Sequence, residues 1–256
     1  MRTTSRVNYD AIAHLYDGQP YRRKTIDPEL VTFIAQYASS DRLTLLDIAC
    51  GTGSQLVANR PILPDAQLVG LDRSLGMLAQ ARSKASDIAW VRADGAQLPF
   101  RAETFDFICC QFAFHHLPDK PRMLREVFTL LRSGGRFVMR NLCPQDHPDW
   151  LYYEYFPDAQ TIDLADFWPL DTIVSTMQTI GFVAITATPE HMRFEQDLRL
   201  WLDMIRRRDL NSQLMAISDR AYEAGIARLE RELSDAPAAQ MRTDHLCLLT
   251  LRAEKR

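Results

Sequence analysis

The stretch that decides the fold is Leu46-Asp47-Ile48-Ala49-Cys50-Gly51-Thr52-Gly53, in which an apolar run leads into a glycine-rich turn. The apolar residues predict a buried strand over 44–50. Gly51 and Gly53 permit positive φ angles, and they let a ligand approach the backbone before a helix begins at Ser54. The stretch therefore predicts a strand, a ligand-binding turn and a helix.

Short apolar runs alternate with helical patterns from about residue 27 to residue 142. The pattern predicts strands at 44–50, 66–72, 88–92, 105–112 and 136–141, and helices at 54–59, 74–83 and 118–131. We expect Ser133-Gly134-Gly135 to stop the last of these helices. This alternation is typical of a doubly wound α/β fold with a mostly parallel sheet.

The second half of the chain is less regular. Aromatic side chains are concentrated in 146–168, namely Trp150, Tyr152, Tyr153, Tyr155, Phe156, Phe167 and Trp168. This density favours a substrate cap or pocket wall, although aromatic residues are more often simply core. Beyond it the sequence predicts a helix at 172–180 that ends at Gly181, a strand at 182–188, a mostly helical stretch at 196–233 and a last strand at 245–252.

Composition limits the classes of partner. The 256 residues carry a formal net charge of -3, which gives no overall basic field for nucleic acid or an anionic membrane. No apolar run reaches the roughly 18 residues that span a bilayer, and the start Met-Arg-Thr-Thr-Ser-Arg is not followed by an apolar signal core. We therefore expect a cytoplasmic protein without a nucleic-acid or membrane partner, either a monomer or a homodimer.

The cysteines and their histidine neighbours do not predict a metal site. The five cysteines show no repeating spacing, and Cys109, Cys110 and Cys247 lie within apolar runs, so we expect reduced core residues. Cys109 and Cys110 are adjacent on a strand and point to opposite faces, so they cannot converge on one ion with His115 and His116.

Three acids end, or follow, three consecutive predicted strands: Asp47, Asp72 and Asp94. The carboxyl ends of parallel strands meet at one edge of a sheet, so these side chains are expected to line one crevice. Asp47 suits a positively charged group such as an ammonium, Asp72 suits ribose hydroxyls, and Asp94 suits an exocyclic amine such as that of adenine. A nicotinamide dinucleotide site would also place an acid near Asp72, but its fingerprint requires a third glycine where this chain has Leu56.

Several short motifs occur in the same order as in one known family. They are Leu46–Gly53, Asp72-Arg73-Ser74-Leu75-Gly76-Met77-Leu78, the run from Asp94 to Leu98-Pro99-Phe100, Phe105-Asp106, His115-His116-Leu117 and Leu130-Leu131-Arg132-Ser133-Gly134-Gly135-Arg136-Phe137. Over about residues 40 to 142 the chain resembles class I S-adenosylmethionine-dependent methyltransferases of the quinone-biosynthesis-like group (type 11). The resemblance implies a Rossmann-like, seven-stranded sheet whose last strand is antiparallel, and S-adenosyl-L-methionine as cofactor.

The resemblance also implies a set of cofactor-binding positions. The methionine part falls on Asp47, Ala49, Gly51 and Gly53, the ribose on Asp72, and the adenine on Asp94 with Gly95 or Ala96; further contacts are expected from Tyr16, Cys50, Arg73, Met77, Gln111 and Phe112. The chain departs from the family at Ala49, where glycine is frequent, and at Ser133, where proline is frequent. We expect Ala49 to cost some room near the ligand and Ser133 only to weaken a turn.

Residues 9–17 resemble the family's amino-terminal segment, which folds over the cofactor. Tyr9 and Tyr16 are seven residues apart and would share one helical face, although the same helix could simply bury Ile12 and Leu15. In the domain organisation that we expect, 1–256 is a single methyltransferase domain. Its parts are a lid helix at 1–26, a cofactor-binding core at 27–142 and substrate-cap insertions at 143–168 and 190–240.

Methyl transfer depends mainly on alignment and desolvation, and it needs a general base only for weakly acidic acceptors. His115 and His116 follow the fourth strand and are candidates for that base, or else a structural pair. Arg206-Arg207-Arg208 could face an anionic substrate, although such a run is more often a solvated helix face. A small-molecule acceptor is the leading expectation; the alternatives are an RNA or protein acceptor and a non-catalytic module that binds S-adenosylmethionine.

Overall fold

The computed structural model describes residues 7–19, 22–37, 42–147, 149–234 and 240–256. The chain divides into two compact units. The unit with the glycine-rich turn consists of Tyr9–Asn141, Leu170–Thr188 and Thr250–Arg256, and we call it the sheet unit. The other consists of Met1–Asn8, Leu142–Pro169 and Pro189–Leu249, and we call it the helical unit.

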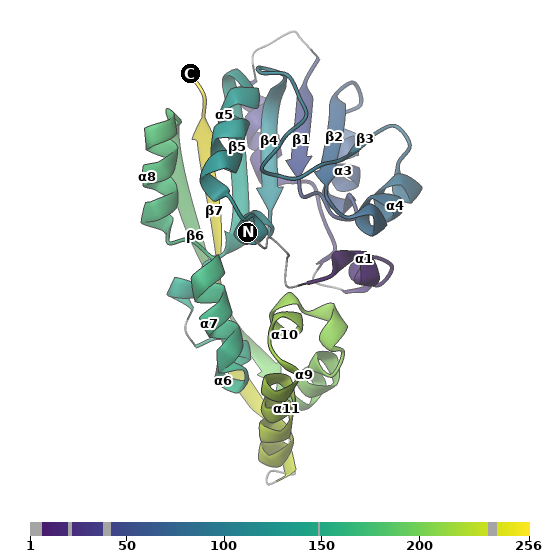
Figure 1. Ribbon diagram of the computed structural model, residues 1–256, viewed down its shortest axis with the longest axis vertical. Helices are drawn as coiled ribbons and strands as arrows, with labels where there is room; N and C mark the ends of the chain where they lie inside the picture. The colour runs from purple at the N-terminus through teal and green to yellow at the C-terminus, as the bar shows by residue number, and fades with distance from the viewer. Residues whose placement is uncertain (1–6, 20–21, 38–41, 148, 235–239) are drawn as a thin grey trace. The chain divides into compact units, whose positions relative to one another are not determined.

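A seven-stranded sheet runs through the described part of the chain in the order β3-β2-β1-β4-β5-β7-β6 (Figure 1). The strands are β1 (Thr44–Ile48), β2 (Gln67–Asp72), β3 (Ala89–Arg92), β4 (Phe105–Gln111), β5 (Leu131–Leu142), β6 (Val183–Asp197) and β7 (Met241–Glu254). Strands β1 to β5 pair in parallel. Because the order reverses between β1 and β4, the crevice outside their carboxyl ends is a topological switch point, where such sheets bind ligands.

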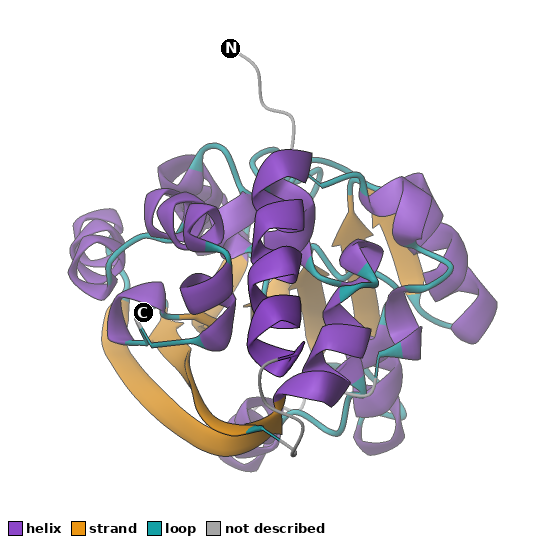
Figure 2. Ribbon diagram, turned by 90° about the horizontal axis from the view of Figure 1, so that it is seen from below, coloured by secondary structure: helices purple, strands orange, loops and turns teal. Residues whose placement is uncertain are grey.

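Strand β7 runs antiparallel to β5. Gly134 N–H donates to the Lys255 carbonyl at 2.7 Å, and nine residues later Cys143 N–H donates to the Cys247 carbonyl at 3.0 Å, so the partners advance in opposite directions. The predicted fold class is thereby confirmed. Both β6 and β7 are continuous strands, drawn in orange in Figure 2, and both contribute residues to each unit.

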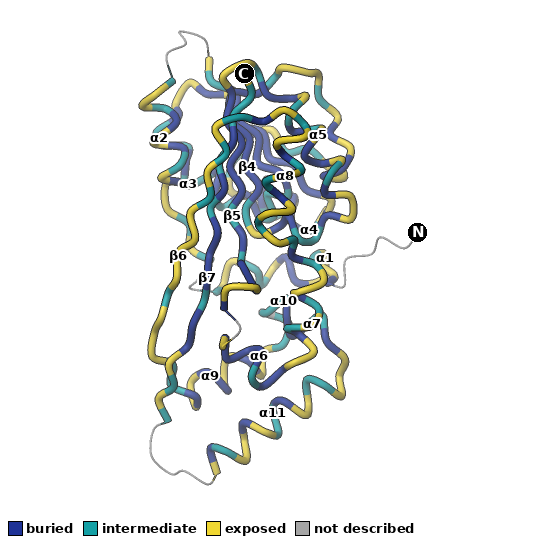
Figure 3. Tube along the Cα trace, turned by 90° about the vertical axis from the view of Figure 1, so that its left-hand side faces the viewer, coloured by how far each residue is buried: buried dark blue, intermediate teal, exposed yellow. Residues whose placement is uncertain are grey.

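In the sheet unit, helices cover both faces of the sheet (Figure 3). Helices α2 (Pro28–Gln36), α3 (Ser54–Asn59) and α4 (Leu75–Lys84) lie on one face, and α5 (Lys120–Leu130) and α8 (Leu170–Ile180) lie on the other. On the first face Leu30, Phe33 and Leu56 pack against Leu45 and Phe107 in one apolar cluster. The burial of β4 along almost its whole length explains why its sequence is an unbroken apolar run.

The role expected of Ser133-Gly134-Gly135 is wrong. Helix α5 ends at Leu130, and the three residues lie inside β5 rather than stopping the helix. Between the partners Phe105 and Phe107 the register on β5 moves from Leu131 to Arg136, and Gly134 adopts φ +77°. The glycines therefore let extra residues loop out of the strand, since a left-handed residue is cheapest as glycine.

The predicted N-terminal helix is shorter than expected. Helix α1 covers only Tyr9–Ile12, and a 3₁₀ turn, η1, follows at Tyr16–Gly18. The rings of Tyr9 and Tyr16 nevertheless meet, with centroids 6.2 Å apart in an edge-on arrangement. A break in the helix thus brings the two rings together without the shared helical face that the spacing predicted.

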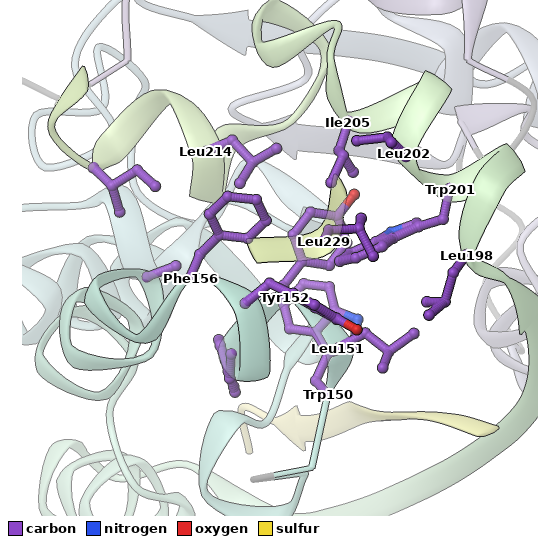
Figure 4. Packing of buried hydrophobic residues seen from close by; sticks show 14 of the residues in the cluster. Trp150, Leu151, Tyr152, Phe156, Leu198, Trp201, Leu202, Ile205, Leu214 and Leu229 are labelled. Atoms are coloured by element: carbon purple, nitrogen blue, oxygen red, sulfur yellow. The ribbon is translucent and has the colours of Figure 1, made fainter. Parts of the chain in front are cut away.

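The helical unit is built around the aromatic block. It contains α6 (Leu151–Tyr155), α7 (Pro157–Asp166), α9 (Leu198–Ile205), α10 (Ser212–Ala216) and α11 (Asp219–Ser234). Trp150, Tyr152 and Phe156 are buried in one cluster with Trp201 and Leu229, as Figure 4 shows. The aromatic side chains of residues 150–156 thus form the core of this unit, and the part of the chain predicted as helical from residue 196 begins two residues later, because β6 extends to Asp197.

Candidate functional site

The glycine-rich turn after β1 is held to the end of β2 by two hydrogen bonds. Cys50 N–H donates to the Leu71 carbonyl at 3.0 Å, and Gly51 N–H donates to Oδ2 of Asp72 at 2.9 Å. Gly51 has φ +55°, and a Cβ atom added there would meet no protein atom within 4 Å. The turn therefore leaves open space on the side of Gly51 while its backbone stays fixed.

Gly53 and Ala49 are also in the left-handed region. At Gly53, which has φ +72°, a Cβ would come within 2.3 Å of the Trp90 ring, so that glycine is required by packing. Ala49 has φ +58° and is one of the described non-glycine residues in this region. A left-handed conformation is costlier for alanine than for glycine, so Ala49 is a strained position in the turn.

Asp72 connects the turn to the next helix. Its Oδ1 accepts from Ser74 N–H at 2.8 Å, and its Oδ2 accepts from Gly51 N–H. Burial raises the pKa of Asp72, and the two backbone amides oppose that shift. A carboxylate has about four lone-pair sites. Asp72 can thus accept ligand hydroxyls while it keeps both backbone contacts.

Asp94 follows β3 and shapes a tight turn. Its Oδ1 accepts from Ala96 N–H at 2.8 Å. At Gly95, between them, a Cβ would approach a methyl group of Leu117 to 2.8 Å and Ile48 to 3.5 Å. The backbone at Gly95 therefore packs directly against the apolar side chains of Ile48 and Leu117, and the Asp94 carboxylate lies next to it in the chain.

Asp47 is the most buried of the three acids, with 3% of its surface exposed. Burial raises the pKa of Asp47 to about 7, against the lowering effects of a hydrogen bond from the Cys109 thiol and of the Lys24 ammonium. A buried carboxylate without a bound cation is costly, because desolvation disfavours its charged form. The position suits a ligand that brings a positive charge.

Three further predicted contacts lie around the ends of β1 and β2. The Cys50 thiol contacts the Gly51 carbonyl and is buried enough that its pKa is raised. Arg73 is exposed, and its carbonyl accepts from Nε of Arg92 at 3.2 Å. Met77 is buried in the first turn of α4, where its N–H donates to the Ser74 hydroxyl at 3.1 Å.

Gln111 ends β4 and Phe112 follows it, next to residues that the sequence did not single out. Nε2 of Gln111 donates to Oδ2 of Asp27 at 2.8 Å, and Oε1 of Gln111 accepts from the Lys24 ammonium at 3.3 Å. Phe112 has φ +54° and is 37% exposed. A bulky residue with positive φ is a strained feature that often marks a functional position. Asp27 before Pro28 is a helix-start signal, whereas Lys24 carries no local signal at all.

The N-terminal segment is fastened to the same edge by two acids that were also missed. Oδ1 of Asp10 accepts from the Ser74 hydroxyl and from Gly76 N–H, both at 2.7 Å, at the start of α4. Asp17 accepts from the Thr52 hydroxyl at 2.7 Å and pairs with the Lys84 ammonium at 2.5 Å. Tyr16, between these anchors, has the Arg22 guanidinium 3.5 Å from its ring centroid.

The two histidines lie in the 3₁₀ turn η4 (Phe114–His116) that follows β4. Nδ1 of His115 is 3.1 Å from Oδ1 of Asn141, Nε2 of His116 is 2.8 Å from the Tyr9 hydroxyl, and the two rings are 3.8 Å apart. Burial lowers the pKa of both, that of His116 to about 4. Both imidazoles are therefore neutral at pH 7, and burial makes each a weaker base than a free imidazole.

The arginine run belongs to the helical unit, where each member faces acids. Arg206 pairs with Glu230 at 2.8 Å, and Arg207 pairs with Asp209 at 3.3 Å. Arg208 pairs with Asp219. These pairs favour the solvated, ion-paired reading of the run over an anion site.

Two features are absent from the described residues. They contain no group of three or more His, Cys, Asp or Glu side chains placed to hold a metal ion. Every helix in the described ranges is too short or too polar to cross a bilayer. The five cysteines are free thiols, of which Cys109, Cys110, Cys143 and Cys247 are buried and Cys50 is half-buried.

Comparison with known proteins gives matches to methyltransferases. Residues 46–139 match the family described as a methyltransferase domain. The chain is 33% identical over 151 residues to demethylmenaquinone methyltransferase of Lactiplantibacillus plantarum, covering 55% of this chain and 60% of the relative. It is 35% identical over 118 residues to 2-phytyl-1,4-naphtoquinone methyltransferase of Thermosynechococcus vestitus, covering 44% and 51%. The chain thus spans less than two thirds of the curated relatives it matches.

A solved structure extends the likeness of fold beyond that region. Phosphoethanolamine N-methyltransferase 2 of Haemonchus contortus, solved with S-adenosyl-L-methionine, superposes with a TM-score of 0.60 over 96% of this chain and 57% of its own, at 17% identity. The predicted resemblance is confirmed by these matches. Residues 46–139 match a methyltransferase-domain family, and the chain is similar there to class I methyltransferases of the quinone-biosynthesis-like group, with a Rossmann-like fold.

Proposed function

We propose that this protein is an S-adenosylmethionine-dependent methyltransferase that acts on a small-molecule acceptor. The observation that carries the proposal is the row of three carboxylates, Asp47, Asp72 and Asp94, at the carboxyl ends of the adjacent strands β1, β2 and β3. The three carboxylates are hydrogen-bond acceptors, and each of the three parts of the cofactor offers a hydrogen-bond donor. An ammonium, a pair of ribose hydroxyls and an exocyclic amine are all donors, and each acid accepts.

The shape of the turn supports the same fit. A Cβ at Gly51 would meet nothing within 4 Å, and the same residue is held to Asp72 by its N–H. We infer that Asp47 holds the methionine ammonium, Asp72 the ribose, and Asp94 with the Ala96 amide the adenine. When bound, S-adenosylmethionine supplies an electrophilic methyl group carried on a sulfonium.

The chain's own residues would orient that methyl group and keep water away from it. Phe112 presents a partly exposed ring at the end of β4, and the neutral imidazoles of His115 and His116 follow it. We propose these two histidines as the proton acceptors for a hydroxyl or amine acceptor. The anchors from Asp10 and Asp17 hold the N-terminal segment over the same edge, which favours desolvation of the reacting groups.

For the acceptor we propose an aromatic small molecule of the quinone type. The support is the similarity to relatives named as demethylmenaquinone and 2-phytyl-1,4-naphtoquinone methyltransferases. The negative net charge and the ion pairing of Arg206, Arg207 and Arg208 speak against an RNA acceptor.

Calorimetric titration with S-adenosylhomocysteine tests the cofactor site. Wild-type protein should bind, Asp72→Ala should lose binding, and the exposed Asp65→Ala should bind like wild type. Absence of binding to wild type, in a buffer where a known methyltransferase gives heat, would refute the proposal. Methyl-labelled S-adenosylmethionine with reduced naphthoquinones, total RNA or cell protein as acceptors then identifies the acceptor class, and transfer to RNA alone would contradict the small-molecule assignment.

A further inference from the structure

The Lys24 side chain contacts the carboxyl end of β4, at the topological switch point of the sheet. The function proposed above gives Lys24 no role. It belongs to the segment that leads into α2. Thr25 and Asp27 of that segment are fixed against α3, because the Thr25 carbonyl accepts from Gln55 Nε2 at 2.9 Å and Asp27 N–H donates to Asn59 Oδ1 at 2.9 Å. The backbone beside Lys24 is therefore held in place by buried contacts.

The Lys24 ammonium is itself aimed by a chain of hydrogen bonds. Asp27 accepts from the amide nitrogen of Gln111, and this contact turns the amide oxygen of Gln111 toward Lys24, which donates to it at 3.3 Å. The ammonium also lies 5.1 Å from the centroid of the Phe112 ring. Since Gln111 ends β4 and Phe112 follows it, the positive charge sits at the carboxyl edge of that strand.

Asp47 provides the matching negative charge on the neighbouring strand. In the β1–β4 ladder Asp47 pairs with Cys109, two residues before Gln111, and the two strands lie side by side in Figure 1. The charges of Lys24 and Asp47 interact, since Lys24 lowers the pKa of Asp47 and Asp47 opposes the lowering of the pKa of Lys24 by burial. One fixed cation and one fixed anion thus stand together where the methionine end of the cofactor is expected.

The amino-acid end of S-adenosylmethionine is a zwitterion, so an acid alone would satisfy only half of it. Asp47 can receive the ammonium but would repel the carboxylate. We propose that Lys24 binds the carboxylate of the cofactor's amino-acid end, forming with Asp47 a two-charge clamp for the zwitterion. This inference rests on the proposed function, because it assumes that the cofactor occupies the Gly51 turn.

Arg140 is a further cation near Lys24, and it affects the choice of control. Its charge contributes to the lowered pKa of Lys24, and its carbonyl accepts from Phe112 N–H at 2.7 Å, so Arg140 is part of the β4–β5 frame. Replacing Arg140 would disturb that frame. Arg23 is a better matched control, since it is the exposed cation next to Lys24.

The test compares two nucleosides that differ in the amino-acid end. S-adenosylhomocysteine carries the zwitterion, whereas 5′-deoxy-5′-methylthioadenosine has the same adenosine and thioether without it. Calorimetry should show that Lys24→Ala weakens S-adenosylhomocysteine binding by about 10- to 100-fold, as expected for loss of a partly buried charge-assisted contact. Binding of methylthioadenosine should be unchanged, and Arg23→Ala should bind both nucleosides like wild type.

The methylthioadenosine titration also shows whether the variant is folded, because it uses the adenosine site alone. Lys24→Arg should recover part of the lost affinity. Unchanged or tighter binding of S-adenosylhomocysteine to Lys24→Ala would overturn the clamp, since tighter binding is the result expected if Lys24 merely competes with the ligand for Asp47. Equal loss for both nucleosides would also overturn it. If wild type binds neither nucleoside, the proposed function itself fails.

Discussion

The hydroxyl of Tyr9 lies 2.8 Å from Nε2 of His116, and the two rings meet edge-on with centroids 5.6 Å apart. The contact joins the first helix of the sheet unit to the turn after β4, 107 residues later. Burial raises the pKa of Tyr9, so its hydroxyl stays protonated and donates to the neutral imidazole of His116. The geometry identifies His116 as a fastening point for the N-terminal segment as well as a candidate base.

Tyr9→Phe removes this hydrogen bond and little else. We expect the free energy of unfolding to fall by about 1 to 2 kcal/mol, because the buried His116 nitrogen loses its partner. Urea unfolding followed by circular dichroism measures the change. A double-mutant cycle with His116→Asn isolates the contact; additive effects of the two substitutions would show that the Tyr9 contact contributes nothing.

The lowered pKa of His116 makes stability depend on pH. Its folded-state pKa is about 4 and its unfolded value about 6.5, so between these values the unfolded chain binds more protons. Stability is therefore fully present above pH 6.5 and falls as the pH is lowered toward 4, by up to about 3 kcal/mol from this residue. His116→Asn should flatten that part of the curve. A variant curve parallel to wild type would contradict the assignment.

Asp47 should make ligand affinity depend on pH between about pH 6 and pH 8, above the range in which His116 affects stability. The ammonium of S-adenosylhomocysteine prefers the ionised carboxylate, and the pKa of Asp47 is about 7 in the free protein. Affinity should therefore rise by about tenfold between pH 6 and pH 8. Titration of wild type and Asp47→Asn at both pH values checks this. The variant should bind weakly at both, and a wild-type affinity that is constant with pH would sink the prediction.

Two glycines give a matched pair for the packing of the turn. Gly53→Ala brings a Cβ within 2.3 Å of the Trp90 ring at a positive φ, and we expect a loss of about 2 to 4 kcal/mol in the free energy of unfolding. Gly18→Ala meets nothing within 4 Å and should change stability by less than about 0.5 kcal/mol. Thermal and urea unfolding of the two variants decide the matter, and similar losses would be inconsistent with the contact.

A third glycine tests the packing of the helical unit. At Gly225 of α11 a Cβ would lie 2.2 Å from the Phe156 ring and 2.7 Å from the Tyr155 carbonyl. Gly225→Ala should therefore destabilise by about 2 kcal/mol or more, despite the better helix propensity of alanine. Ala227→Gly, on the same helix, isolates the propensity effect. A Gly225→Ala variant more stable than wild type would show that α11 packs differently.

The parts of the fold that local patterns determine could be predicted from the sequence. Strands β1 to β4 begin and end within two residues of the prediction, because buried parallel strands are short unbroken apolar runs. The segment around Gly134 could not be predicted, since the same glycines serve a helix stop or an irregular strand and only pairing with β4 decides. The long exposed part of β6 has no apolar run to reveal it.

The site residues likewise fall into those that the sequence predicted and those that it did not. Asp47, Asp72 and Asp94 were found because each ends or follows a strand, and the topology brings those ends together. Their roles toward the cofactor stay predictions. Lys24, Asp10 and Asp17 come from segments without periodic pattern, and they meet the sheet edge through contacts across 35 to 87 residues. Spacing in the sequence carries no trace of such contacts.

Neither unit of this protein is one continuous piece of chain, because β6 and β7 pass from one into the other. A gene fragment for either unit alone would have to splice together segments that the ribosome makes far apart. The sheet unit needs residues 250–256 beside β5, so it cannot be completed during translation until those residues have been made. Nascent chains truncated before residue 250 should therefore remain protease-sensitive, however complete their glycine-rich turn.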